Sequence, residues 1–473
     1  MNVLLVRAKP DFTDMIYGLP VGLAFVAAHA RQAGHRVAVA DLALSRSTTE
    51  ADERLISRLR ETKPDVVGFT AMTVEYRSAA RAARLVREHL PSATVVFGGQ
   101  HPTVRAAETA AEPFCDGVVR GEGEEVFTAL LGGLESGADL SKLRGLAFRR
   151  DGEVVLTEPH PLVEDLDTLP WPAYDLLEME RYFRANSART SPKHRRVVQL
   201  FTSRGCPWHC CYCHDLFGKR FRGRSPENVV AEMKMLQETW RIREFMIDDD
   251  VFNFDIRRAK RIFELIPAEG VKATFQFNNG LRLEHFDEDL VRRMAAAGTH
   301  FIAVAIESAS PRIQKMIRKH VHLDRAARTL SWMRKYGIRT LGFFMLGFPT
   351  ETREEIEETI RCAAALDLDE ALFSIATPYP GTELSRQVDA MGLYDPDRVS
   401  LGGEGFSALK TDQFDFATLK DFQRRAYRTF FLAKGRWLRM LPRLLNVRTS
   451  WKYLKAIERN FLPARRGRGT RIS

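Results

Sequence analysis

The residues best suited to chemistry lie together between positions 203 and 214, in the run Ser-Arg-Gly-Cys-Pro-Trp-His-Cys-Cys-Tyr-Cys-His. Within this run, Cys206, Cys210 and Cys213 follow the pattern Cys-x3-Cys-x2-Cys. Three thiolates on one short loop can converge on a single inorganic centre, and thiolates favour zinc and iron–sulfur clusters. A structural zinc ion takes four protein ligands in a tetrahedron. Three cysteines can instead hold a cubane cluster and leave one iron open to a small molecule, so the spacing favours an iron–sulfur site.

A zinc site is the alternative for the same loop, because His209, Cys211 and His214 offer further ligands. Zinc signatures usually come as two separated cysteine pairs, however, and no second pair occurs in this sequence. Cys115 and Cys362 stand alone and are expected to be buried core residues. Cys211 is expected to point away from the other three cysteines, so we leave it out of the metal site.

The second half of the chain contains the elements expected to position this loop. Six apolar runs recur there with helical patterns between them, which predicts a partial barrel of βα units. These runs cover residues 197–202, 245–248, 273–278, 301–306, 340–346 and 371–376. The cysteine loop directly follows the first run. It is therefore expected at the carboxyl end of the strands, where barrels of this kind place their sites.

Polar residues and glycines follow several of the other runs at the same end. They are Asp248, Asn278, Arg282, Glu307, Ser308, Gly347 and Pro349. An acid at such a position can hold hydroxyl or amino groups, and an arginine can hold a carboxylate. The alternative is that Asp248 belongs to a solvated turn and that Arg282 forms a surface ion pair.

The first half of the chain alternates short apolar runs with amphipathic helical stretches, which predicts a parallel, doubly wound sheet. The expected strands are residues 2–6, 36–40, 65–69, 93–97 and 117–120. Ligands of such sheets bind beyond the carboxyl ends of the strands. The candidates at those ends are Thr70, Met72, Thr73, Gly98, Gly99, His101, Gly121, Glu122 and Gly123. Glycines at such positions let a ligand approach the backbone closely.

The cysteine spacing, with Tyr212 directly before the third cysteine, resembles that of the radical S-adenosylmethionine (radical SAM) enzymes. The glycine-rich strand ends, with Leu-Pro-Val-Gly-Leu at residues 19–23, resemble the cobalamin-binding domain fused to many of these enzymes. One departure is that no Asp-x-His-x-x-Gly motif occurs, so the lower face of a bound cobalt would lack a histidine. His101 follows a strand, but in a different pattern. The alternative for this half is a degenerate Rossmann-like domain that binds no cofactor or a nucleotide.

The resemblance implies an α/β fold: an N-terminal Rossmann-like, doubly wound cobalamin-binding domain, then a partial (β/α)6 TIM-type radical SAM barrel, then a helical C-terminal region. We expect the first domain at residues 1–140, a hairpin and linker at 141–192, the barrel at 193–390 and the helical, basic region at 391–473. The implied cofactors are a 4Fe-4S cluster on Cys206, Cys210 and Cys213, S-adenosylmethionine and cobalamin. Tyr212 and the polar residues after the barrel strands become candidate contacts of S-adenosylmethionine, and the first-domain residues candidate contacts of cobalamin.

The resemblance implies that S-adenosylmethionine is cleaved to a 5′-deoxyadenosyl radical, and it leaves two reactions open. One is methylation of an unactivated carbon or phosphorus centre of a small, natural-product or lipid-like molecule. The other is a cobalamin-associated cyclisation or rearrangement without net methyl transfer. A zinc-stabilised binding module is the alternative from another class. The expected partners are a small-molecule substrate and an electron donor such as flavodoxin or ferredoxin, and no nucleic acid is expected.

The net charge of +10 over 473 residues is concentrated at the C-terminal end. From Lys434 onward, 12 Lys or Arg residues accompany a single acid, Glu458, so the rest of the chain is close to neutral. This tail favours either peripheral contact with an anionic membrane or a helix with solvated arginines. With no signal-peptide pattern, no apolar run of membrane-spanning length and few cysteines outside the loop, a cytoplasmic location is expected.

Overall fold

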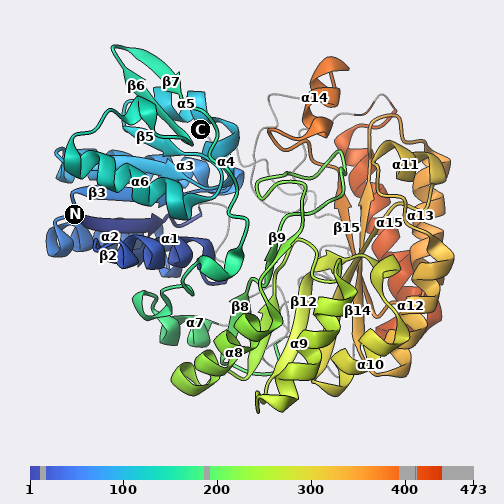
Figure 1. Ribbon diagram of the computed structural model, residues 1–473. Helices are drawn as coiled ribbons and strands as arrows, with labels where there is room; N and C mark the ends of the chain where they lie inside the picture. The colour runs from blue at the N-terminus through green and yellow to red at the C-terminus, as the bar shows by residue number, and fades with distance from the viewer. Residues whose placement is uncertain (11–17, 186–191, 394–410, 412, 439–473) are drawn as a thin grey trace.

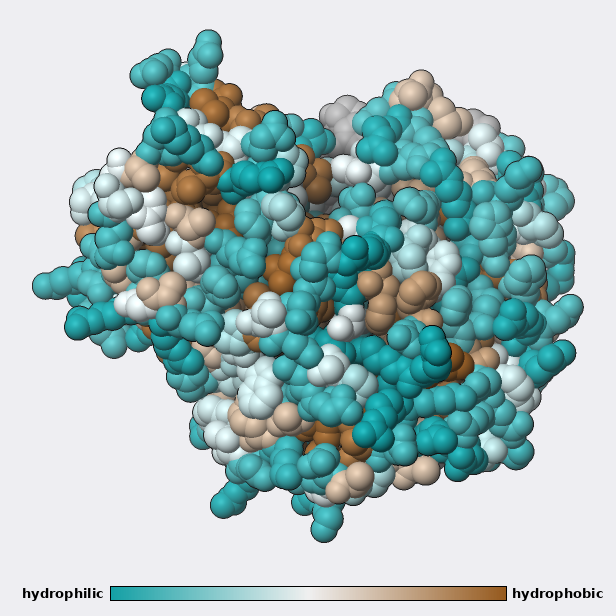
Figure 2. All heavy atoms as spheres, viewed as in Figure 1, coloured by the Kyte–Doolittle hydropathy of each residue, from teal (hydrophilic) through white to brown (hydrophobic). Residues whose placement is uncertain are grey.

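The computed structural model describes residues 1–10, 18–185, 192–393, 411 and 413–438. Two α/β bodies lie side by side, and the segment that contains β8 and β9 runs between them (Figure 1). The face in view is largely hydrophilic, with hydrophobic atoms gathered over the first body and where the two bodies meet (Figure 2). The parts expected to carry cofactors therefore share a boundary.

The first body is built on a seven-stranded sheet with the order β2-β1-β3-β4-β5-β6-β7. Its first five strands are parallel and confirm the expected runs: β1 (Asn2–Arg7), β2 (Arg36–Asp41), β3 (Val66–Thr70), β4 (Thr94–Gly98) and β5 (Gly117–Val119). Successive residues of β1 enter opposite cores, with Val3 and Leu5 on one face and Leu4 and Val6 on the other. Burial on both faces explains why the run is apolar without alternation.

Helices cover both faces of this sheet. One face carries α1 (Val21–Gln32) and α6 (Gly123–Ser136), and the other carries α2 (Thr48–Thr62) and α3 (Tyr76–His89). Two short helices, α4 (Gln100–Val104) and α5 (Ala106–Ala111), follow β4. The core on the α1 side continues through Tyr174 and Met179 into the second body. The two bodies are therefore joined by apolar packing as well as by polar contacts.

The predicted hairpin is present, but it belongs to the first sheet. It consists of β6 (Leu146–Arg150) and β7 (Glu153–Leu156), and β6 pairs antiparallel with β5. Asp151 and Gly152 both have positive φ, as a tight two-residue hairpin turn requires. The first sheet thus extends beyond residue 140, the boundary expected from the sequence. The reason is that β5 would otherwise be an open edge, and the hairpin pairs with it.

The second body is a six-stranded parallel sheet with the order β15-β14-β13-β12-β11-β8. The strands are β8 (Val197–Leu200), β11 (Glu244–Ile247), β12 (Thr274–Leu281), β13 (Thr299–Glu307), β14 (Arg339–Leu346) and β15 (Glu370–Ile375). Their order follows the chain, and β8 and β15 form the two edges, so the barrel is partial as expected. Two strands run further than predicted, which places Asn278 within β12 and Glu307 at the last position of β13.

Helices alternate with these strands. They are α8 (Pro226–Trp240), α9 (Ile256–Ala268), α10 (Glu288–Ala296), α11 (Pro311–Met316), α12 (Leu323–Lys335) and α13 (Arg353–Ala365), followed by α14 (Glu383–Ala390) and α15 (Phe416–Leu432). Helix α15 confirms the helical start of the C-terminal region, whereas most of the basic tail lies outside the described residues. Within the described part of the chain, no helix is long and apolar enough to cross a membrane.

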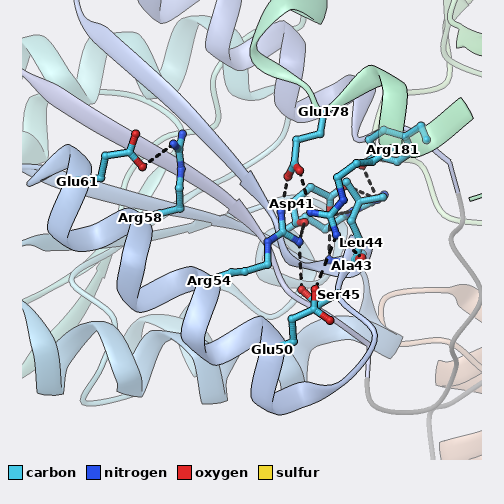
Figure 3. A network of polar contacts seen from close by, with 12 residues as sticks. Asp41, Ala43, Leu44, Ser45, Glu50, Arg54, Arg58, Glu61, Glu178 and Arg181 are labelled. Atoms are coloured by element: carbon cyan, nitrogen blue, oxygen red, sulfur yellow. Dashed lines mark hydrogen bonds and ion pairs between the residues drawn. The ribbon is translucent and has the colours of Figure 1, made fainter. Parts of the chain in front are cut away.

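Helix α7 (Met179–Ala185), between the two bodies, contacts the loop after β2 through a polar network (Figure 3). Arg54 of α2 pairs with Glu178 and donates to the backbone oxygen of Asp41 at 3.2 Å. Arg181 pairs with Glu178 at 2.8 Å and donates to the backbone oxygen of Leu44 at 2.9 Å. This outer junction fixes the linker to the first body on the side where solvent reaches the charges.

Candidate functional site

The cysteine loop is closed at its base by a two-stranded antiparallel ribbon. Strand β9 (Ser203–Arg204) pairs with β10 (Arg222–Gly223), so both ends of the loop are held together. Gly205 begins the loop at a φ of +83°, and a Cβ there would lie 2.1 Å from the backbone oxygen of Arg220. Only glycine fits this position. The ribbon therefore sets the direction in which the loop leaves the sheet.

Two acids that follow β11 hold the start of this loop. The buried carboxylate of Asp249 accepts hydrogen bonds from the backbone nitrogen of Thr202 at 2.6 Å and from the hydroxyl of Ser203 at 2.6 Å. Asp250 accepts one from the backbone nitrogen of Gly205 at 3.1 Å. Asp249 and Asp250 therefore hold the cysteine loop. Asp248, which directly precedes them, accepts a hydrogen bond from the side chain of Gln199 on β8.

The three predicted ligands differ in exposure. Cys206 and Cys210 are half-buried, whereas Cys213 is exposed. Burial raises the pKa of Cys206, and burial with the neighbouring Cys210 and Cys206 raises the pKa of Cys213 to about 12. The mutual influence shows that the three thiols are close neighbours.

The donor set of this loop suits an iron–sulfur cluster, because cysteine thiolates are the ligands that such clusters take from proteins. In the described part of the chain, no three His, Cys, Asp or Glu side chains are grouped so that they could hold a single metal ion.

Cys211 faces away from its three neighbours, as expected. Its side chain is 1% exposed and packs in a small core that includes Ile317 and Phe348. Its backbone nitrogen donates to the oxygen of Ile317 at 3.2 Å, and its backbone oxygen accepts from Leu384 at 2.8 Å. Cys211 therefore anchors the loop to the barrel. Of the two lone cysteines, Cys115 is buried as predicted, and Cys362 packs half-buried against the core.

A buried polar triad adjoins the cysteine loop. The hydroxyl of Tyr212 donates to the carboxylate of Glu307 at 3.1 Å, and the ammonium of Lys319 lies 3.3 Å from both. Burial and the Glu307 charge raise the pKa of Tyr212 well above its ordinary value. Glu307 ends β13 with a φ of +69°, an uncommon backbone conformation outside glycine. The sequence predicted Tyr212 and Glu307 at this site but missed Lys319, whose turn has no motif.

Arg282 supports the loop rather than facing open solvent. It follows β12 directly, and its guanidinium lies 4.3 Å from the ring centroid of Trp208 in the cysteine loop. It also pairs with Glu284 at 2.9 Å and donates to the backbone oxygen of Lys319. The surface ion pair considered from the sequence is thus wrong, because Arg282 is 6% exposed.

Asn278 is a candidate contact whose side-chain amide is left unpaired by the protein. Both polar atoms of its amide are buried and have no hydrogen-bond partner among the described residues. Leaving such atoms unpaired costs about 1–3 kcal/mol for each group. A molecule bound at the strand ends would satisfy a donor and an acceptor at once.

Ser308, Gly347 and Pro349 have local structural roles. The Ser308 hydroxyl lies 3.2 Å from that of Thr359 and is fully buried, and Pro349 is buried as well. A Cβ on Gly347, one of the candidate contacts of S-adenosylmethionine, would lie 2.8 Å from Leu419 of α15. The missing side chain therefore makes room for a helix that the sequence could not place.

At the carboxyl ends of the strands in the first sheet, glycines allow the ends of β3 and β4 to lie close together. Gly99 has a φ of +95°, and a Cβ there would lie 2.9 Å from the Thr70 hydroxyl. Gly98 precedes it at the end of β4. Next to them Met72 is exposed, at 44%, while Gly121 has open space around its missing side chain. These strand ends thus present backbone groups and the thioether of Met72 rather than charged side chains.

His101 lies in the same edge, where it packs against protein groups. Its ring stacks on that of Tyr76 with the centroids 4.1 Å apart, and its Nδ1 lies 3.3 Å from the Thr73 hydroxyl. Burial lowers the pKa of His101 to about 4, so the imidazole is neutral near pH 7. Gly123 begins α6 and lies close to Val26 of α1.

Glu122 corrects the expectation that its side chain faces a cofactor. Its carboxylate is paired with Arg204 of β9 at 2.9 Å and with Arg222 of β10 at 2.9 Å. It also accepts from the backbone nitrogen of Val163 at 2.8 Å. Glu124 pairs with Arg204 at 2.5 Å. We call these two acids and two arginines the inner junction, because they connect the β5–α6 loop with the base of the cysteine loop.

Two family models match the chain. Residues 17–131 match the B12 binding domain, and residues 200–363 match the radical SAM superfamily. The first match covers β2 to β5 of the first sheet with their helices, and the second covers most of the partial barrel. The order of the two domains along the chain is the one expected from the sequence.

Relatives extend along most of the chain. An uncharacterized methyltransferase of Pyrococcus horikoshii is 35% identical over 88% of this chain and 88% of its own length. Cytidylyl-2-hydroxyethylphosphonate methyltransferase of Streptomyces wedmorensis is 29% identical over 80% of this chain and 79% of its own. Anaerobic magnesium-protoporphyrin IX monomethyl ester cyclase of Rubrivivax gelatinosus is 28% identical over 88% and 74%, respectively.

Among solved structures, the radical S-adenosylmethionine methyltransferase TsrM from Kitasatospora setae, described with cobalamin and a [4Fe-4S] cluster bound, is similar with a TM-score of 0.69. The match covers 89% of this chain and 84% of that one at 21% sequence identity. At this level the likeness establishes the arrangement of the fold.

Proposed function

The chain belongs to the radical SAM enzymes that carry a B12-binding domain, and from this premise we propose that it methylates an unactivated carbon or phosphorus centre of a small molecule. The observation that carries the proposal is a contact between the segments that follow the carboxyl ends of the strands in the two bodies. Val104, beside the glycine-rich edge, occupies the space that a Cβ on Gly381 of the barrel would fill, at 2.5 Å. This contact supports the proposal, because transfer from one cofactor to the other requires the two candidate sites to adjoin.

The residues that would hold the groups follow from the site. Cys206, Cys210 and Cys213 would ligate a [4Fe–4S] cluster, while the backbone around Gly98 and Gly121 would approach cobalamin. When bound, the cluster with S-adenosylmethionine supplies reductive radical chemistry, and cobalamin supplies a methyl carrier. Reduction requires an external electron donor, for which a flavodoxin or ferredoxin is the proposed class.

The chain's own side chains would bind and orient the small molecules. Asn278 offers one buried donor and one buried acceptor, which suits a polar group of S-adenosylmethionine or of the substrate. Lys319 and Glu307 place a cation and an anion beside the thiols, where little water competes. Arg282, through Trp208, and Cys211, through its backbone, hold the loop in place. Substrates of the natural-product or lipid-like class remain part of the proposal.

A cyclisation or rearrangement without net methylation is the second candidate, because one of the relatives carries a cyclase name. The two reactions differ in how they use S-adenosylmethionine. Methylation consumes one molecule as methyl donor, leaving S-adenosylhomocysteine, and cleaves another to methionine and 5′-deoxyadenosine. Cyclisation or rearrangement needs only the cleavage.

The test supplies S-adenosylmethionine with a deuterated methyl group, a reductant and a panel of small molecules that begins with the compound in the phosphonate methyltransferase's name. Methylation gives labelled product with comparable amounts of both by-products. Unlabelled product with 5′-deoxyadenosine alone would assign the second candidate instead. As matched controls, Cys206→Ala should abolish cleavage and Cys211→Ala should retain it, because only the former removes a proposed cluster ligand.

A further inference from the structure

Glu122 is placed between the two candidate cofactor sites. It lies on the loop between β5 and α6, where Gly121 has a φ of +82° and open space around it. Its carboxylate meets Arg204 on one strand of the ribbon and Arg222 on the other. The ribbon in turn bounds the loop that contains all three cysteine ligands. One side chain is thus bonded to the base of both sites.

The inner junction is buried and balanced in charge. The exposed fractions of the side chains are 3% for Glu122 and 2% for Arg222, with Arg204 at 8%. Burial alone would raise the pKa of Glu122, but hydrogen bonds and charge from Arg222 and Arg204 hold it below its ordinary value. Buried charges of this kind have a narrow range of favourable geometries, because a displaced carboxylate or guanidinium loses compensation that water does not replace.

Both arginines also fix backbone on the cysteine side. Arg222 donates to the backbone oxygen of Phe217, within the cysteine loop, at 2.9 Å. Arg204 lies between the rings of Phe25 and Phe217, at 5.2 and 5.4 Å from their centroids. A shift of the β5–α6 loop therefore acts on the loop that carries the thiols, and a shift of that loop acts back on the first body.

We infer that Glu122 is a positioning residue that couples the two cofactor sites, so that occupation of one raises the affinity of the other. The inference rests on the proposed function, since it requires a corrinoid in the first body and a cluster on the cysteine loop. Coupling between two sites is reciprocal: each ligand changes the affinity for the other by the same factor. A residue with a purely structural role would change the affinity for the corrinoid equally in the presence and in the absence of the cluster, so the ratio of these two affinities would stay the same.

The experiment measures the affinity of the full-length protein for hydroxocobalamin by absorbance, once with the iron–sulfur cluster reconstituted and once in metal-free protein. We expect binding to be about five-fold or more tighter with the cluster, which is the lower end of typical coupling between sites. In the double variant Glu122→Gln, Arg222→Gln, this ratio should fall toward one. The double variant removes both charges together, so no isolated charge is left buried.

Two further variants provide controls. Glu124→Gln loses a contact with Arg204 but keeps Glu122 bound to both arginines, so it should retain most of the ratio. Asp175→Asn breaks the exposed ion pair with Arg31 between the first body and the linker and should leave the ratio unchanged. If the double variant does not fold, amide exchange of residues 203–224 in metal-free wild-type protein is the second measurement: added hydroxocobalamin should slow it.

The outcomes separate the inference from the function on which it rests. Normal hydroxocobalamin binding with the same affinity in both states of the wild-type protein, or unchanged exchange at residues 203–224, overturns the coupling alone. No hydroxocobalamin binding in either state overturns the proposed function and the coupling with it. A ratio that survives in the double variant assigns the coupling to other contacts and overturns the role of Glu122.

Discussion

Two loops of the molecule contain a buried glutamate after a glycine of positive φ, yet the two carboxyl groups have opposite electrostatic properties. Glu122 follows β5 and Gly121, which has a φ of +82°; Glu351 follows β14 and Gly347, which has a φ of +81°. Both loops lie at the carboxyl edge of a parallel sheet. Arginines hold the pKa of Glu122 below its ordinary value, whereas burial raises the pKa of Glu351 to about 8.

The difference arises from where the partners come from. Glu122 receives two arginines from the other body, and they compensate its charge. Glu351 accepts hydrogen bonds only from its own loop, from the backbone nitrogens of Gly347 at 2.6 Å and Phe348 at 3.1 Å. Its other carboxyl oxygen is buried without a partner among the described residues. A buried acid therefore becomes an ion or a neutral acid according to the tertiary contacts that surround it.

The largest expected effect comes from the ionised member of this pair. Glu122→Gln should lower the free energy of unfolding by about 3–5 kcal/mol near pH 7, because it leaves two buried arginines undercompensated. Urea unfolding of the metal-free protein measures this change. The wild-type contribution is present above the ordinary pKa of a glutamate and is lost as the pH falls through the lowered native value. A change below about 1 kcal/mol, as for exposed pairs, would contradict the comparison.

The neutral member should respond in the opposite direction to pH. Between the ordinary pKa of about 4.3 and the native value, folded protein holds a proton that unfolded protein has lost. The stability of the wild type should therefore fall as the pH rises from about 5 to about 8. Glu351→Gln removes this dependence and should be more stable than the wild type at pH 9 by up to about 5 kcal/mol, because one pKa unit corresponds to about 1.4 kcal/mol.

The measurement is urea unfolding of wild type and Glu351→Gln at pH 5, 7 and 9. At pH 5 the two proteins should differ little, because glutamine resembles a protonated glutamate in size and charge. A difference that is the same at all three pH values would mean that Glu351 is ionised in the folded protein.

The smallest effect concerns the two glycines. Alanine at either position adopts a left-handed conformation that costs about 1–2 kcal/mol. Gly121 has open space, whereas a Cβ at Gly347 would lie 2.8 Å from Leu419. Gly347→Ala should therefore destabilise metal-free protein by about 1 kcal/mol more than Gly121→Ala does, because α15 must shift. Equal losses would show that backbone strain alone decides both positions.

The sequence predicted what depends on local pattern. The apolar runs that became β1 and β13 are buried along nearly all their length, so no alternation was needed to recognise them. The cysteine spacing predicted the loop, and Cys211, which was left out of the proposed metal site, is buried in a small core. Tyr212 and Glu307, 95 positions apart, were both predicted at the site because each stands next to a recognisable strand end or motif.

What the sequence could not predict depends on distant partners. The arginines that bind Glu122 lie 82 and 100 positions further along the chain, and no pattern in the sequence relates either of them to Glu122. The helix that fills the space beside Gly347 begins at Phe416. The pattern of a strand likewise does not show which sheet edge a hairpin will join, so the pairing of this hairpin with β5 could not be predicted. Each of these features is set by packing between elements rather than by periodicity within one.

The ribbon at the base of the cysteine loop has a consequence for how the protein is made. Because β9 and β10 and the inner junction involve only polypeptide, the ends of residues 205–221 are brought together as the chain folds. The entropy of closing this loop is then lost during folding rather than during iron delivery. Maturation can therefore proceed in two stages. The polypeptide first folds and closes the loop, and iron and sulfide are inserted afterwards.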